Sequence, residues 1–160
     1  IYLGAQMLFR SRDQGRTWTA ISGDLTGGVD HPAGTENPPA DALSRNDGAS
    51  PFASLTSVSE SPLDARVLYT GAQDGTVQVT RDGGATWTNI TTRFPGVPRN
   101  TYVSTVLASA HAAGRAYVTF DGHYTGDYSA YLFVTEDFGQ TWKPLMGGDT
   151  SINQIGRAHV

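Results

Sequence analysis

The octapeptide SRDQGRTW at residues 11–18 decides the fold, because this chain contains the same pattern three times. It returns as TRDGGATW at residues 80–87 and as TEDFGQTW at residues 135–142. Each copy has a hydroxyl residue, then Asp, Gly, Thr and Trp at the same relative positions. A pattern of this length that recurs along one chain indicates a repeated structural unit.

The sequence before each octapeptide also repeats. The run IYLGAQ at residues 1–6 aligns with LYTGAQ at residues 68–73, and AYVTFDG at residues 116–122 begins a looser third copy. Short runs rich in Val, Tyr and Thr, separated by Asp-Gly and Ser-Pro turns, predict four short antiparallel strands in each unit. The first unit lacks its first strand. In the second unit we expect strands near residues 52–59, 67–71, 76–80 and 86–90.

The predicted strands are apolar on both faces, as in YLFV at residues 131–134. A sheet of this kind is buried between two neighbouring sheets. Repeated four-stranded antiparallel units that stack on one another are typical of a β-propeller. We therefore predict an all-β fold, a partial β-propeller of about three four-stranded blades. The octapeptide forms the turn between the third and fourth strands of each blade, and almost no helix is expected.

The domain organisation follows from the spacing of the octapeptides. The stretch at residues 23–51 is rich in Gly, Pro, Asn and Asp and predicts a long interblade loop. The last six residues, IGRAHV, match the translation of a common sequencing adapter, and we interpret them as non-native. The chain also opens within a predicted strand, so we expect a fragment of a larger ring. The predicted segments are a partial blade at 1–22, the interblade insertion at 23–51, complete blades at 52–92 and 93–146, and the start of the next blade at 147–160, with 155–160 non-native.

Composition excludes several classes of protein. The net charge of −4 gives no basic face for nucleic acid. The chain has no cysteine, so neither a disulfide framework nor a thiolate metal site is possible. No apolar run in the sequence is long enough to span a bilayer. We expect no cofactor.

The octapeptide itself is interpreted as structural. Its Asp accepts hydrogen bonds from the turn backbone, its Gly takes a left-handed conformation, and its Trp packs against neighbouring structure. A calcium loop needs several oxygen ligands, usually with more than one carboxylate among them, whereas Arg precedes the Asp in two of the three copies. A catalytic site does not need three copies in separate blades. The structural residues are Ser11, Asp13, Gly15, Trp18, Thr80, Asp82, Gly84, Trp87, Thr135, Asp137, Gly139 and Trp142.

The pattern SxDxGxxW is similar to the Asp-box, or BNR repeat, of sialidases, xyloglucan-cleaving glycosidases and sortilin/Vps10-type propellers. The longer stretch ESPLDARVLYTGAQDGTVQVTRDGGATWTNIT at residues 60–91 resembles bacterial BNR-repeat proteins of the sortilin/Vps10-like group. The resemblance implies a β-propeller but leaves the activity open, because enzymes and non-enzymes share the repeat. No Arg-Ile-Pro segment like that of sialidases occurs in these 160 residues, and RFP at residues 93–95 is no equivalent. The cysteine-rich module of sortilin-type receptors follows their propeller and is not part of this fragment.

Candidate binding residues are expected at the end of the blades opposite the octapeptides, because turns alternate between the two ends of an up-and-down blade. This end collects residues 94–100 and the loop DGHYTGDYS at residues 121–129, whose tyrosines and acids suit a sugar or a peptide. The alternative is that Asp121 and Gly122 form an ordinary turn and that the tyrosines are packing residues. His123 has no second His nearby, so no metal site is predicted. The candidates are Gln73, Asp74, Asp121, His123, Tyr124, Asp127 and Tyr128.

These observations favour an exported propeller that binds a protein or carbohydrate ligand as a scaffold. The alternative is a glycoside hydrolase, xyloglucanase-like or sialidase-like, which would need two acids across the scissile bond, one with a raised pKa. A third hypothesis is a purely structural blade array within a larger assembly. No catalytic residue is assigned from the sequence, and the expected location is the periplasm or the extracellular space.

Overall fold

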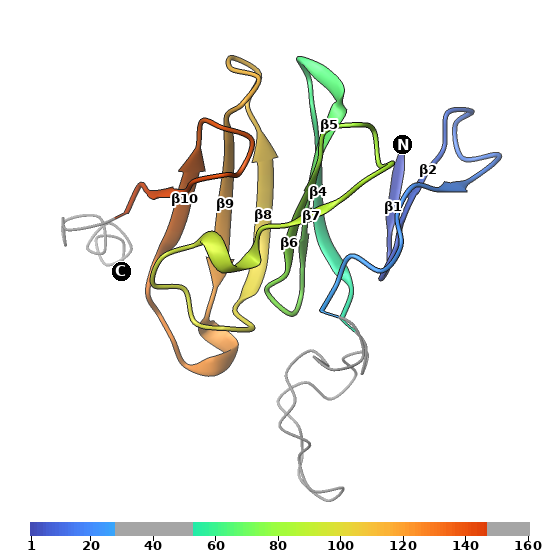
Figure 1. Ribbon diagram of the computed structural model, residues 1–160. Helices are drawn as coiled ribbons and strands as arrows, with labels where there is room; N and C mark the ends of the chain where they lie inside the picture. The colour runs from blue at the N-terminus through green and yellow to red at the C-terminus, as the bar shows by residue number, and fades with distance from the viewer. Residues whose placement is uncertain (28–52, 147–160) are drawn as a thin grey trace, which may run out of the picture.

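The computed structural model describes residues 1–27 and 53–146. Most of the predicted interblade insertion, and the predicted start of a further blade with its non-native tail, therefore lie outside the described residues. The all-β prediction is confirmed: the described chain forms three antiparallel sheets that stand side by side (Figure 1). In the described ranges, no helix is long and apolar enough to cross a membrane.

Each sheet is built from strands that follow one another in the chain. The first sheet contains β1 (Tyr2–Gly4), β2 (Leu8–Arg10) and β3 (Thr19–Ala20). The second contains β4 (Leu55–Ser61), β5 (Asp64–Ala72), β6 (Val77–Thr80) and β7 (Thr88–Asn89). The third contains β8 (Tyr102–Ala108), β9 (Ala116–Asp121), β10 (Tyr131–Thr135) and β11 (Lys143–Pro144). Two single-turn 3₁₀ helices, η1 (Thr91–Arg93) and η2 (His123–Thr125), are the only helices among the described residues.

The hydrophobic core lies between the sheets. Strand β5 is buried on both faces from Val67 to Ala72, because the second sheet is sandwiched between the first and the third. The larger apolar cluster joins the second and third sheets and includes Val77, Val103 and Phe133. A smaller cluster joins the first and second sheets. This two-sided burial explains why β5 lacks the apolar–polar alternation of a strand with one solvent-exposed face.

The octapeptide turns have the same hydrogen bonds in all three sheets. In the first copy, Ser11 Oγ donates to Asp13 Oδ1 at 2.8 Å and accepts from the Gly15 N–H at 2.8 Å. The Asp13 carboxylate also accepts from the Thr17 N–H at 2.9 Å and from the Thr17 hydroxyl at 2.6 Å. Equivalent bonds form around Asp82 and Asp137. The Asp therefore closes the hairpin by pairing backbone and hydroxyl donors that the short strands leave unpaired.

The same turn also contacts the preceding blade. The Trp87 indole N–H donates to the Ile21 carbonyl at 3.0 Å, and Gly84, at φ +102°, lies against that carbonyl. Trp142 is only 6% exposed, and its ring centroid lies 4.7 Å from that of Phe94. The octapeptide thus fixes both its own hairpin and the contact between consecutive blades.

These turns make stability depend on acid pH. The pKa values of Asp13 and Asp137 are lowered to about 2, and that of Asp82 is lowered as well, above all by hydrogen bonds from Thr17, Thr141 and Thr86. Because an unfolded Asp has a pKa of about 3.9, this stabilisation is complete above about pH 5 and is lost as the pH falls toward 2. We expect the melting temperature, followed by circular dichroism, to fall over that range.

Asp82→Asn isolates the contribution of one turn from those of the other acids. This variant should melt lower than the wild type at pH 7, and its melting temperature should fall less between pH 5 and pH 2. Parallel pH curves for the two proteins would contradict the assignment.

Candidate functional site

The blades present two different ends. The octapeptide turns lie at the upper end in Figure 1, and the β5–β6 turn, the segment at residues 94–101 and the η2 loop lie together at the lower end. We call this lower end the loop end. The predicted binding residues lie at this end, so the candidate binding site consists of the loops that meet there.

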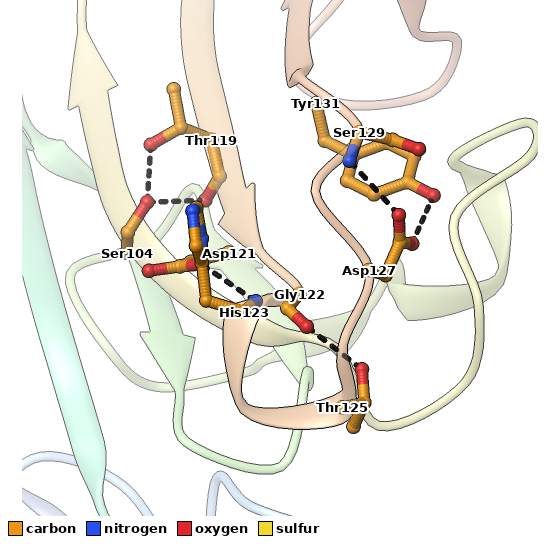
Figure 2. A network of polar contacts seen from close by, with 9 residues as sticks. All are labelled: Ser104, Thr119, Asp121, Gly122, His123, Thr125, Asp127, Ser129 and Tyr131. Carbon is orange, nitrogen blue, oxygen red and sulfur yellow. Dashed lines mark hydrogen bonds and ion pairs between the residues drawn. The ribbon is translucent and has the colours of Figure 1, made fainter.

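Asp121, at the end of β9, fixes the start of the η2 loop (Figure 2). Its carboxylate accepts a hydrogen bond from the His123 backbone N–H at 2.9 Å and contacts the Nδ1 atom of the same residue. These two bonds, the backbone one foremost, lower the pKa of Asp121. The carboxylate is thus held as a charged hydrogen-bond acceptor within its own turn.

Asp127 performs the same task at the other end of the loop. It accepts from the Tyr131 hydroxyl at 2.7 Å and from the Ser129 N–H at 2.9 Å, and these bonds, led by that of Tyr131, lower its pKa (Figure 2). A Cβ on Gly122 would lie 2.8 Å from the Asp127 Cβ, so this close approach requires glycine. The two acids therefore brace the loop from two positions.

The braced loop presents aromatic rings to solvent. Tyr124 is 64% exposed and Tyr128 is 75% exposed. The Tyr124 ring lies 6.0 Å from that of Tyr102, and the His123 ring meets Tyr128 edge-on at 5.0 Å. We call these four residues the tyrosine surface. They give the loop end apolar ring faces with polar tips, a combination that suits binding.

The other two candidates lie apart from this surface. Asp74 is buried, and its carboxylate accepts from the Gly27 N–H at 2.6 Å and from the Thr76 N–H at 3.0 Å. Gln73 is half-buried, and its backbone N–H donates to the Ser54 carbonyl at 2.9 Å. Both residues join the second sheet to the chain before it. Glu60, near the end of β4, accepts a hydrogen bond from the Tyr2 hydroxyl.

Two pockets were not predicted from the sequence. One, of about 610 Å³, lies at the octapeptide end and is lined by Arg10, Arg12 and Arg66 among others. The second, of about 280 Å³, lies at the loop end and is lined in part by Phe94 and Phe120. The Pro- and Gly-containing run at residues 95–98 could have indicated a loop at the second pocket. It does not reveal which strands form the other walls of that pocket. In residues 1–27 and 53–146, no three His, Asp or Glu side chains are grouped so as to hold a metal ion.

Comparison with known proteins supports the repeat and the fold. Residues 9–20 match the family model described as BNR/Asp-box repeat. The chain carries a BNR/Asp-box repeat. No curated protein sequence matched the chain.

Solved structures with a similar fold include three large proteins. YCF48 bound to D1 peptide is 19% identical, with a TM-score of 0.51 over 87% of this chain and 33% of that one. An ancestral GH74 enzyme is 12% identical, with a TM-score of 0.56 over 89% of this chain and 16% of that one. The GH74 xyloglucanase from Xanthomonas campestris is 21% identical, with a TM-score of 0.51 over 89% and 20%.

This BNR-repeat chain is therefore a partial β-propeller, as the sequence predicted, and each of its three sheets is a blade. It spans a third or less of the length of these structures. Identities this low show the shared fold and do not transfer an activity.

Proposed function

We propose that this chain is part of an exported, non-catalytic β-propeller of the sortilin/Vps10-like group that binds a ligand at its loop end. The observation that carries the proposal is the tyrosine surface. Two exposed tyrosines stand on a loop that Asp121 and Asp127 hold in one shape. Preorganised aromatic side chains bind at a low entropic cost, because little further ordering is needed when the ligand arrives.

The acids of this loop are poorly suited to hydrolysis. A glycoside hydrolase needs a general acid that still holds its proton near neutral pH, which requires a raised pKa. The pKa values of Asp121 and Asp127 are lowered instead, by donors from the same loop. Their hydrogen bonds therefore support a structural role for both acids in the loop. Hydrolase activity remains the alternative that the experiment below tests.

A protein partner is favoured over a carbohydrate. The neighbouring structure of YCF48 contains a D1 peptide, so a propeller with this type of fold accommodates a peptide ligand. The loop end also combines ring faces with exposed polar groups, as peptide-binding surfaces do.

Loss of the exposed rings should weaken binding of the full-length protein to an array of extended peptides. We expect Tyr124→Ala and Tyr128→Ala each to reduce the affinity for the best-bound peptide about tenfold, the size typical of an aromatic anchor. Leu63→Ala, an exposed apolar residue in the β4–β5 turn at the opposite end, is the matched control and should bind as the wild type does.

Soluble xyloglucan serves as the second arm of this experiment. Release of reducing sugar by the wild type, abolished in Asp121→Asn, would establish the hydrolase and refute the proposal. Unchanged peptide binding in both tyrosine variants would refute the assignment of the surface. Export is tested by fractionating the source cells and probing for the protein in the periplasm and medium.

A further inference from the structure

The pocket at the loop end lies in the groove between the second and third blades. Its apolar lining comes from Phe94 and Phe120, which are themselves almost fully buried, and from Val97. Thr92 and Asn100 are exposed lining residues that place polar groups at its opening. An apolar base with polar groups around it is the usual composition of a binding pocket.

Close packing and hydrogen bonds to the backbone hold the walls of the pocket in place. Gly75, at φ +85°, lets the β5–β6 turn approach Thr101, whose carbonyl oxygen would lie 2.8 Å from a Cβ at that glycine. The Thr101 hydroxyl donates to the Pro98 carbonyl at 2.8 Å. On the opposite wall, the Thr91 hydroxyl accepts from the Val77 N–H at 3.0 Å and so fixes η1. A ligand would find the cavity already formed.

The size of the pocket restricts what it holds. Small-molecule sites usually measure about 300–1,000 Å³, and this pocket, at about 280 Å³, lies just below that range. It is therefore large enough for a single aliphatic side chain such as that of leucine, with the rest of the ligand lying outside on the surface. The tyrosine surface begins immediately beside it, because Tyr102 follows Thr101 and its ring contacts Tyr124. A ligand that enters the pocket would continue across those rings.

The charge at the opening of the pocket indicates which ligand group lies next to the side chain that fills it. Arg99 is the only charged residue that lines the pocket, and it is exposed. Within the part of the chain that the structure describes, its guanidinium makes no hydrogen bond or ion pair, whereas Arg93 donates to the Gly139 carbonyl and Arg115 pairs with Glu136. A guanidinium at the opening of an apolar pocket is suited to a carboxylate next to the side chain that fills it.

We propose that this pocket, as part of the ligand surface of the proposed function, receives an aliphatic side chain of an extended peptide, and that Arg99 pairs with an adjacent carboxylate. The carboxylate belongs either to an acidic side chain or to the end of the peptide. Both sources present the same group to Arg99, and they are separated by the choice of ligand below.

The test is saturation-transfer NMR on the full-length protein with three small probes. Acetyl-Leu-Asp-amide carries a side-chain carboxylate, acetyl-Leu-Asn-amide is its neutral isostere, and N-acetyl-leucine carries a terminal carboxylate. We expect the leucine methyls to receive saturation, and the better of the two acids to bind about threefold more tightly than the amide, the size of an exposed ion pair. The acid that binds more tightly identifies the source of the carboxylate.

Three variants assign the effect to the pocket. Arg99→Gln should abolish the preference for the acid and leave binding of the neutral probe unchanged. Thr92→Phe, at an exposed position beside the opening, should weaken all three probes at least fivefold. Arg66→Gln removes an exposed arginine at the octapeptide end and should change nothing.

The proposal is overturned if the acid and the amide bind equally to the wild type, if Arg99→Gln retains the preference, or if no probe binds. These failures are distinct from failure of the proposed function. If only the pocket assignment is wrong, Tyr124→Ala will still weaken capture of array peptides, whereas the pocket variants Arg99→Gln and Thr92→Phe will not.

Discussion

Replacement of Trp142 by alanine is expected to lower the free energy of unfolding by about 3–5 kcal/mol, the usual cost of removing a buried large aromatic side chain. The indole fills the space between the octapeptide turn of the third blade and the chain that enters that blade, where it packs against Phe94. Phe94 in turn contacts Phe120 and Phe133 edge-on, so the cavity would open into the main aromatic cluster. Urea denaturation followed by circular dichroism measures the loss.

Two control variants test whether the loss comes from the buried ring itself. The Trp142 indole N–H is buried without a hydrogen-bond partner among the described residues, so Trp142→Phe should retain much of the stability that the alanine variant loses. Tyr128→Ala removes an exposed ring and should change the free energy of unfolding by no more than about 0.5 kcal/mol. A loss below about 1 kcal/mol in Trp142→Ala would show that this ring does not hold the blades together.

Gly84→Ala should be the most damaging of the small substitutions in the octapeptide turns. At φ +102° any side chain is strained, and an added Cβ would lie 2.5 Å from the Ile21 carbonyl oxygen of the preceding blade. Overpacking of this kind costs about 1–3 kcal/mol. The left-handed conformation adds about 1–2 kcal/mol. The expected total is a loss of about 2–5 kcal/mol, measured by urea denaturation.

The neighbouring glycine provides a matched control. Gly83 also has a positive φ, +77°, but a Cβ there would meet no atom within 4 Å. Gly83→Ala should therefore show the backbone strain alone, and the difference between the two variants measures the contact with the first blade. Equal losses in both variants would mean that the close approach to Ile21 contributes nothing.

Much of the fold could be predicted because its signals are local. The octapeptide hydrogen bonds join residues two to four positions apart, as between Asp82 and Thr80 or Thr86. A short pattern of hydroxyl, Asp, Gly and Thr is therefore enough to predict the hairpin. The strands that flank it follow from apolar runs between turn residues, and each of the four ranges expected in the second blade overlaps one of the strands β4 to β7.

The candidate site could be predicted only in part. The sequence places the acids and tyrosines of residues 121–129 in one loop, and the structure holds Asp121 and Asp127 there as braces. The sequence does not reveal that Asp74 is buried. Asp74 also lies in a hairpin turn and looks as free to bind a ligand as the other acids, but its carboxylate accepts a hydrogen bond from Gly27. That contact joins residues 47 positions apart, and no local pattern records it.

The sequence by itself determined the repeat, the antiparallel hairpins and the Asp–hydroxyl locks, because each depends on neighbours within a few residues. Only the tertiary structure decided exposure. Trp18 and Trp142 occupy the same position in two copies of the octapeptide pattern, yet the first is 40% exposed and the second is buried. The pocket beside Arg99 likewise draws its walls from three separate segments of the chain. Burial depends on which surfaces the folded chain brings together, and a motif of eight residues carries no information about its distant neighbours.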